Sequence, residues 1–155
     1  MIVSCETEIA APPIKVWRAL SDFSTYRRWN PYREVIGSAA LGAKVTLMIG
    51  PDPEGRRKLR ATISVFEPGH RIGFTTGRPL LGRALETYVI EPGRRGTHLL
   101  HTAEMNGLGA LVLGRRSFEP RLLGVYRRVD DALAKYLESG SRGQPSAKSR
   151  GRRAS

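Results

Sequence analysis

Residues 11–32, APPIKVWRALSDFSTYRRWNPY, decide the fold that the sequence predicts. Proline is well tolerated in the first turn of a helix, and Pro13 is followed by apolar residues at helical spacing. These residues are Val16, Trp17 and Leu20. Ser21-Asp22 can cap a second short helix, which ends where Asn30-Pro31 is expected to shape a turn. The stretch therefore predicts two short helices in succession.

Strand-length segments lie on both sides of these helices. Ile2 to Ile9 alternates in polarity, which is the period of a half-buried strand. Six further segments have strand character and are separated by short breaks with turn-forming residues. They cover residues 32–40, 44–50, 57–67, 71–76, 84–91 and 97–105. Breaks this short favour an antiparallel meander, which makes a sheet of about seven strands.

A change of period after Ser117 predicts a long amphipathic helix. Its apolar stripe consists of Phe118, Leu122, Val125, Tyr126, Val129, Leu133, Tyr136 and Leu137. Asp130 is placed largely off this stripe. Pro120 costs about 3 kcal/mol inside a helix but little in its first turn. We therefore place the regular start near Ser117, treat residues 108–116 as a separate lead-in, and expect Gly140 to end the helix.

The length of 155 residues fits one domain with a real core. We divide the chain into a folded domain, residues 1–138, and a disordered basic tail, residues 139–155, whose composition cannot bury enough surface to fold. Lys and Arg number 26 against 14 Asp and Glu. The tail holds five of the basic residues and no acid, which leaves about +7 on the folded part. A basic surface attracts acidic ligands, phosphates or membrane head groups.

The cysteine content and the hydropathy indicate a compartment. The single cysteine, Cys5, rules out an internal disulfide and is compatible with a reducing environment. Glu6 and Glu8 interrupt any apolar run near the N-terminus, and no later segment approaches roughly 18 consecutive apolar residues. We therefore expect a soluble, cytoplasmic protein.

The order of these motifs resembles the SRPBCC superfamily over about residues 1–138. The resemblance is carried by Ala11-Pro12, Val16-Trp17, Leu20, Asp22-Phe23, Tyr26, Trp29-Asn30-Pro31, Gly96-Thr97, His101, Gly107 and the terminal helix. It implies an α+β helix-grip fold, in which a curved antiparallel sheet wraps the C-terminal helix around a deep apolar cavity. START-like lipid carriers, polyketide cyclase/dehydrase-like proteins and plant pathogenesis-related proteins share this fold, so function must be argued from the site.

Alternation assigns one face of each strand to the wall of this cavity. On the last strand the assigned face carries Leu99, His101, Ala103 and Met105. The other candidate ligand contacts are mostly apolar, as is usual for pockets, and each can also be plain core. They are Leu47, Ala61, Ile63, Phe74, Leu85, Thr87 and Val89 from the sheet, and Leu122, Tyr126 and Val129 from the long helix.

His101 is the principal ionisable group on this wall and the candidate catalytic residue. Histidine exchanges protons near neutral pH and can act as an acid or a base. The alternative is a structural histidine, satisfied by a backbone carbonyl or a buried water. No second polar residue is assigned to it from the sequence.

The sequence does not support a metal-binding or dinucleotide-binding motif. His98 and His101 lie three positions apart, so a strand sends them to opposite faces and we expect no metal site. The segment Gly107-Leu108-Gly109 lacks the third glycine of a dinucleotide fingerprint, and we expect no cofactor. Trp17 and Trp29 are expected to anchor the short helices against the sheet.

Three functions fit these observations. The first is binding of a hydrophobic or aromatic small molecule, lipid-like or polyketide-like, in the cavity between the sheet and the C-terminal helix. The second is a polyketide cyclase or dehydratase in which His101 moves a proton. The third is polyanion or membrane-surface contact through the basic tail, which lacks the interleaved aromatics of a nucleic-acid binder, so we assign no specific nucleic acid. We favour non-enzymatic binding and leave the oligomeric state open.

Overall fold

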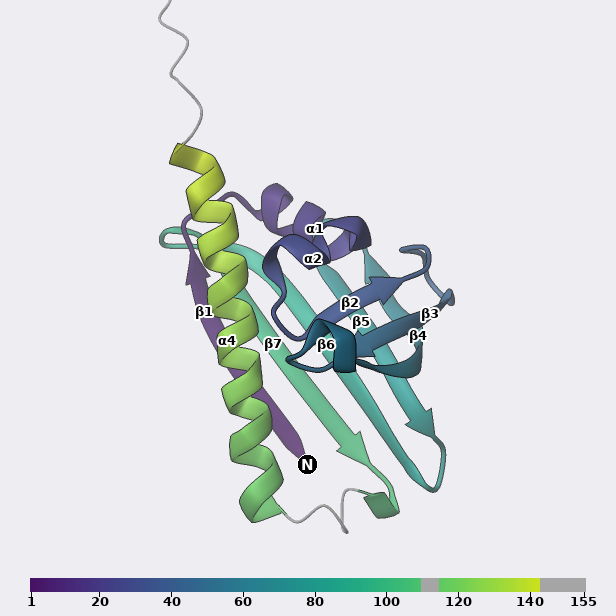
Figure 1. The fold of residues 1–155 in the computed structure, drawn as a ribbon. Helices are drawn as coiled ribbons and strands as arrows, with labels where there is room; N and C mark the ends of the chain where they lie inside the picture. Colours follow the sequence, from purple (N-terminus) through teal and green to yellow (C-terminus); the bar gives the residue numbers. More distant parts are fainter. Residues whose placement is uncertain (110–114, 143–155) are drawn as a thin grey trace, which may run out of the picture.

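A computed structural model of the chain describes residues 1–109 and 115–142 (Figure 1). The elements are β1 (Ile2–Ile9), α1 (Pro13–Ser21), η1 (Phe23–Thr25), α2 (Tyr26–Trp29), β2 (Arg33–Ile36), β3 (Lys44–Ile49), η2 (Pro53–Gly55), β4 (Arg57–Glu67), β5 (Arg71–Arg78), β6 (Gly82–Gly93), β7 (Gly96–Asn106) and α4 (Arg115–Arg142). Most of the expected lead-in and residues 143–155 of the expected tail lie outside the described residues. Polyanion contact through the tail therefore stays a prediction.

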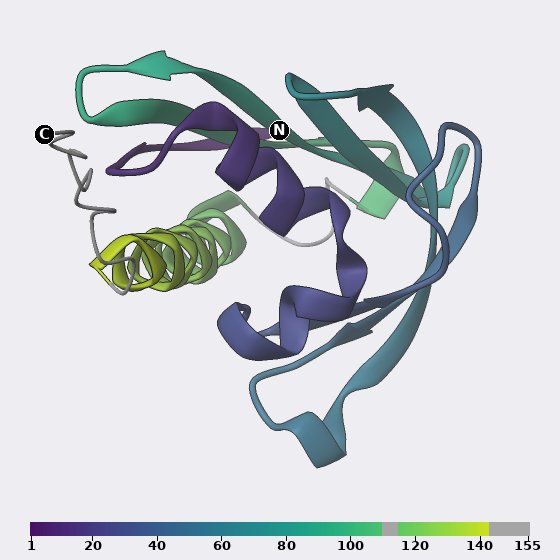
Figure 2. The ribbon, with the colours of Figure 1, turned by 90° about the horizontal axis from the view of Figure 1, so that it is seen from above.

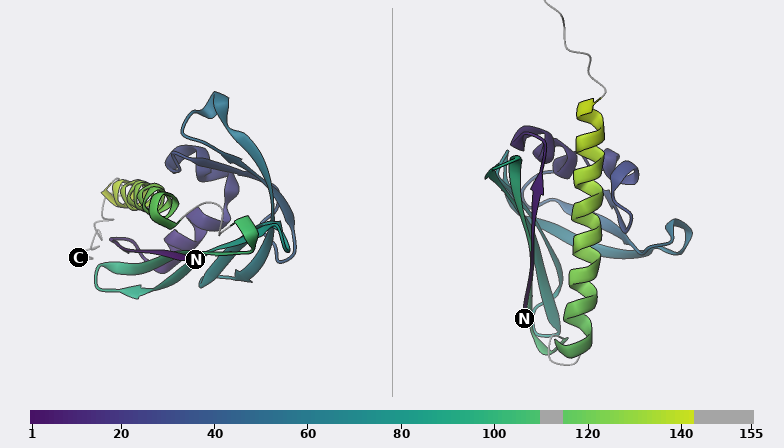
Figure 3. Two further views of the ribbon diagram at one scale, coloured as in Figure 1. Left: turned by 90° about the horizontal axis from the view of Figure 1, so that it is seen from below. Right: turned by 90° about the vertical axis from the view of Figure 1, so that its left-hand side faces the viewer.

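The seven strands form one antiparallel sheet in the order β1-β7-β6-β5-β4-β3-β2. Strands β2 to β7 pair with their neighbours in the chain, and β1 pairs with β7. The sheet curves around α4, and α1 and α2 lie at one end of the concave side (Figures 2 and 3). This arrangement confirms the predicted meander and the α+β helix-grip architecture.

The aromatic side chains of the two short helices belong to the main core. Trp17 and Trp29 are buried, and the Trp17 ring lies 5.4 Å from that of Phe66. The buried Tyr26 hydroxyl donates a hydrogen bond of 2.8 Å to the carbonyl oxygen of Leu20. The predicted anchoring role of the two tryptophans is confirmed.

Helix α4 is longer at both ends than the sequence predicts. It begins at Arg115, so Pro120 lies inside the helix instead of in its first turn. It also passes through Gly140 and ends at Arg142. A helical glycine costs only about 1 kcal/mol, which a long packed helix tolerates. Residues 139–142, expected in the tail, are therefore helical.

The observed boundaries of several strands differ from the predicted ones. β2 ends at Ile36, well before residue 40, because Gly37 adopts a φ of 138° that breaks the extended backbone. β5 and β6 run further than predicted and leave only residues 79–81 between them. The hairpin therefore projects a short tip from the sheet.

Gly96 lets the β6–β7 hairpin approach the start of α1. Its φ is 138°, and a Cβ atom here would lie 2.6 Å from the carbonyl oxygen of Ala11. The Thr97 hydroxyl donates a hydrogen bond of 2.7 Å to the same oxygen. A side chain at position 96 would therefore clash with backbone that Thr97 holds in place.

We expect Gly96→Ala to lower the free energy of unfolding by roughly 2–4 kcal/mol, because of this clash and the unfavourable φ. Urea denaturation measures the change. Gly124→Ala in α4 is the matched control, since no atom lies within 4 Å of its Cβ position. The control should raise the free energy of unfolding by about 0.5–1 kcal/mol. Equal losses in the two variants would contradict the role given to Gly96.

Candidate functional site

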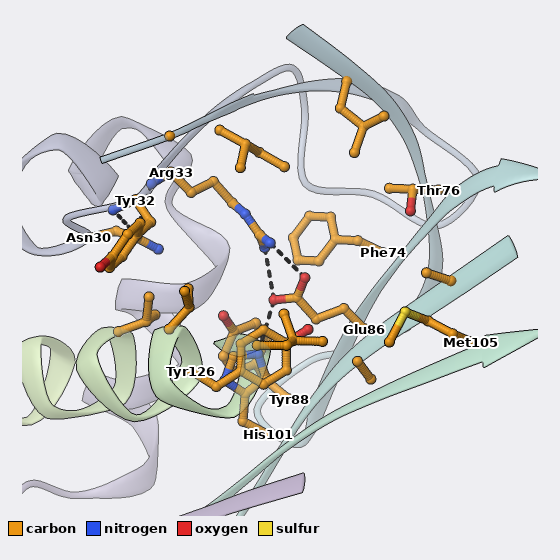
Figure 4. Close-up of a pocket in the computed structure, with 18 of the residues that line it drawn as sticks. Asn30, Tyr32, Arg33, Phe74, Thr76, Glu86, Tyr88, His101, Met105 and Tyr126 are labelled. Carbon is orange, nitrogen blue, oxygen red and sulfur yellow. Dashed lines mark hydrogen bonds and ion pairs between the residues drawn. The ribbon is translucent and has the colours of Figure 1, made fainter. Parts of the chain in front are cut away.

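A cavity of about 460 Å³ lies between the concave face of the sheet and α4 (Figure 4). It opens to solvent, its wall is mostly apolar, and its volume is in the range of small-molecule sites. The wall consists of Asn30, Tyr32, Arg33, Ile49, Gly50, Pro51, Leu59, Phe74, Thr76, Ala84, Glu86, Tyr88, His101, Ala103, Met105, Phe118, Leu122, Val125, Tyr126 and Val129.

Half of the predicted ligand contacts lie in this wall. They are Phe74, His101, Ala103, Met105, Leu122, Tyr126 and Val129. Four others face inward but are not part of the cavity wall. Leu47, Ala61, Ile63 and Leu99 are buried in the main core, together with side chains of α1 and α2. These four positions are packing residues.

The predicted inner face of β6 was wrong. Leu85, Thr87 and Val89 lie outside the cavity wall, and the alternate residues Ala84, Glu86 and Tyr88 line it. The register explains this, because Tyr88 lies directly opposite His101 on β7. Directly opposed residues of an antiparallel pair share a face of the sheet. Glu86 is therefore carried into the cavity by its strand position.

The turn after α2 brings Arg33 to the cavity. The side-chain oxygen of Asn30 accepts hydrogen bonds of 2.9 Å from the backbone N–H groups of both Tyr32 and Arg33. Asn30 is buried, so these bonds also satisfy its amide oxygen. The turn-shaping role predicted for Asn30-Pro31 is confirmed, and it fixes the start of β2.

Four charged side chains form a continuous chain of hydrogen bonds that begins in the cavity wall and ends in the buried interior. Arg33 donates to both carboxylate oxygens of Glu86, at 2.9 and 2.6 Å (Figure 4). The Nε2 atom of His101 lies 2.9 Å from Glu86 Oε1, and its Nδ1 atom lies 2.8 Å from Asp130 Oδ1. The side chains of His101 and Asp130 are 1% and 0% exposed. We call these four residues the ion chain.

Asp130 corrects the predicted helix face. The sequence pattern predicts that Asp130 lies largely off the apolar stripe, but its side chain is fully buried and hydrogen-bonds to His101. Asp130 follows Tyr126 by four residues and precedes Leu133 by three, and both of these are buried. Residues at these spacings share a helix face, so helical geometry overrides the polarity of the side chain.

The ion chain fixes His101 as an imidazolium. Burial alone would lower the pKa of His101, but the hydrogen bonds to Asp130 and Glu86 outweigh it and raise the pKa above its usual value. Burial would raise the pKa of Glu86, yet the charge of Arg33 and the bond to His101 hold it far below its usual range. Two cations thus face two carboxylates, and the chain is internally neutral.

Two tyrosines enclose the imidazole ring. The rings of Tyr88 and Tyr126 stack on His101 with centroids 4.0 and 3.8 Å away and interplanar angles of 23° and 15°. Burial raises the pKa of both tyrosines, so their hydroxyls are protonated near neutral pH. Neither hydroxyl forms a hydrogen bond with another described residue. Both are donors that a bound molecule can use.

Two further chemical groups, His98 and Cys5, are not part of the cavity wall. His98 faces the opposite side of β7 and pairs with Glu8 at 2.8 Å. Burial and the neighbouring charge of Asp130 raise the pKa of the Cys5 thiol, which disfavours the reactive thiolate. In the described parts of the chain, no group of three or more His, Cys, Asp or Glu is arranged to hold a metal ion.

The raised pKa of His101 predicts a pH-dependent stability. A raised folded-state pKa contributes stability fully below about pH 6.5, the usual histidine value, and this contribution is lost as pH rises through the folded-state pKa. We expect the free energy of unfolding to fall as the pH rises from about 6.5 through the folded-state pKa of His101, and this slope to vanish in His101→Gln. Urea denaturation across this range measures it.

Below pH 6.5 the free energy of unfolding of His101→Gln should be roughly 3–5 kcal/mol lower than that of the wild type, because the substitution leaves Asp130 buried without a cation. His98→Gln is the matched control and should retain the slope, since His98 lies on the outer face. An unchanged slope in His101→Gln would show that His101 is not the titrating group.

A family model described as polyketide cyclase / dehydrase and lipid transport matches residues 2–138. The search of curated proteins found no match. No helix in residues 1–109 and 115–142 has the length and apolar character needed to cross a membrane.

Solved structures of similar shape come from several bacteria. The Mesorhizobium loti protein MLL2253 has a TM-score of 0.71 at 21% identity, over 94% of this chain and 100% of that chain. The Staphylococcus aureus protein SA2116, described as of unknown function, has a TM-score of 0.73 at 11% identity, over 92% and 96%. DynU16, described as a putative protein in the dynemicin biosynthetic locus, has a TM-score of 0.72 at 20% identity, over 90% of this chain and 48% of that chain. At these identities the likeness shows the fold.

Proposed function

Because the chain belongs to the polyketide cyclase/dehydrase and lipid transport family, we propose that it binds a hydrophobic small molecule in the cavity between the sheet and α4. The observation that carries this proposal is a mostly apolar wall around about 460 Å³, with two tyrosine hydroxyls in it that have no hydrogen-bond partner among the described residues. The apolar wall provides affinity, and the hydroxyls provide orientation.

The composition of the wall supports the proposal. The cavity opens to solvent, so without a ligand water contacts its aliphatic and aromatic side chains. Removal of apolar surface from water is favourable by about 25 cal/mol per Å². A ligand with an apolar body removes this wall from water.

The polar groups of the cavity wall indicate which functional groups a ligand should carry. The ion chain is internally neutral, so the ligand needs no charge to compensate it. The hydroxyls of Tyr88 and Tyr126 are donors, and each favours an oxygen acceptor. Phe74 and the two tyrosines also offer ring faces. We therefore propose a ligand with a partly aromatic, apolar body and a carbonyl-type oxygen.

Catalysis by His101 stays a prediction. Both ring nitrogens already hydrogen-bond to carboxylates, and the raised pKa of His101 keeps the ring protonated. A general acid or base needs a ring nitrogen that is free to reach the substrate, and both nitrogens of His101 are engaged by carboxylates. The geometry therefore favours non-enzymatic binding.

Filling the cavity should abolish binding. Ala84 lines the cavity, and Ala84→Leu adds volume there without adding charge. We expect the dissociation constant of 8-anilinonaphthalene-1-sulfonate to rise by about tenfold or more, because the probe loses space. Fluorescence titration measures this. Thr87→Leu, on the other face of β6, is the matched control and should bind like the wild type. Identical binding by both variants would place the probe outside the cavity.

The hydroxyl of Tyr126 should distinguish ligands with and without an oxygen. We expect Tyr126→Phe to weaken binding of 2-acetylnaphthalene by about fivefold, the value of one hydrogen bond, and to leave 2-ethylnaphthalene unchanged. Displacement of the fluorescent probe gives both affinities. Tyr136→Phe, outside the cavity wall, is the control. Equal loss for both naphthalenes would mean that Tyr126 contributes only shape.

A further inference from the structure

Three leucines are exposed together at one end of the molecule. Leu80, Leu81 and Leu108 are 86%, 65% and 61% exposed. Backbone hydrogen bonds join the β5–β6 turn to the residues after β7. The Leu108 N–H donates to the carbonyl oxygen of Leu80 at 3.4 Å, and the Gly109 N–H donates to that of Leu81 at 2.9 Å. Figure 1 shows the β5–β6 turn and the end of β7 at the lower end of the sheet. We call these three leucines the leucine tip.

Leu80 is poorly suited to its backbone conformation. Its φ is 75°, and no other non-glycine residue has a positive φ in residues 1–109 and 115–142. Glycine and asparagine adopt this conformation at low cost, whereas leucine does not. The Leu80 side chain is also almost fully exposed, so packing does not compensate the strain. Stability of the folded chain therefore gives no reason for leucine at this position.

Arginines flank the leucine tip. Arg78 and Arg83 are both exposed and lie on the two strands that form the turn. Neither has a salt bridge to an acidic residue among those that the structure describes. Apolar residues within a basic border are complementary to an anionic lipid surface. A second copy of this chain would instead bring the same arginines toward one another.

The leucine tip adjoins the cavity. Thr76, Ala84 and Met105 line the cavity and also a smaller depression beside it. That depression reaches Gly82 and Gly109, which follow the leucines directly in the chain. Contact between the tip and a lipid surface would therefore place one end of the cavity against that surface.

We propose that the leucine tip inserts into the head-group region of an anionic membrane, with Arg78 and Arg83 against lipid phosphates. The occupant of this surface is the lipid itself. This docking goes beyond ligand binding and does not depend on the identity of the ligand, because the three leucines are not part of the cavity wall.

Vesicle flotation of the full chain tests the proposal. The wild type should float with vesicles of phosphatidylcholine and phosphatidylglycerol, should not float with phosphatidylcholine alone, and should dissociate at high salt. Leu80→Asn should reduce the bound fraction about tenfold, because it removes an inserted side chain. The same variant should unfold at an equal or higher urea concentration, because asparagine tolerates the backbone conformation. Lower binding together with undiminished stability is a signature that misfolding does not give.

Leu41→Ser is the matched control, because Leu41 is 67% exposed in the connection between β2 and β3. It should bind vesicles like the wild type. Equal flotation of wild type and Leu80→Asn would overturn the proposal. So would a dimer in sedimentation that Leu80→Asn abolishes while no vesicles are bound, since the occupant would then be a second copy. The variant Ala84→Leu, in which ligand binding should be lost, should still float with the vesicles. Failure of membrane docking can therefore be distinguished from failure of ligand binding.

Discussion

An imidazolium held between two carboxylates connects the sheet to the long helix. His101 on β7 hydrogen-bonds to Glu86 on β6 and to Asp130 on α4, and Arg33 of β2 completes the charge balance. Desolvating four ionised groups is expensive, and their attraction offsets this cost only while every partner is present. The ion chain therefore helps to position α4 over the sheet, together with buried α4 side chains such as Leu133, and with it the space for a ligand.

The order of elements was predictable because each element has a strong local signal. Pro13 and Pro31 mark where the short helices begin and end, and the turns contain Gly or Pro. The ends of α4 were less predictable. Gly140 favours a stop, but whether a helix continues through a glycine depends on the packing of its neighbours, which a single sequence does not contain. The start of the helix before Pro120 depends in the same way on the packing of neighbouring residues.

The site was predictable only in part, because it combines local and distant information. Alternation places His101 correctly on the inner face of β7, but on β6 it assigns the face of Leu85, Thr87 and Val89, whereas the alternate residues line the cavity. A two-residue turn pairs Gly93 with Gly96, and this register alone places Tyr88 opposite His101. Nothing near Arg33 in the sequence indicates Glu86 as its partner, since the two come together only through the curvature of the whole sheet.

The stacking of Tyr88 and Tyr126 on His101 has a thermodynamic consequence. Aromatic faces attract a cation, so the two rings help the imidazole to keep its proton in a buried site. Tyr126 also lines the cavity and lies where a ligand would rest. A molecule that displaced this ring would remove one cation–π contact from His101, so ligand association and the proton affinity of the imidazole would share one side chain, and the heat of association would then vary with the ionisation enthalpy of the buffer.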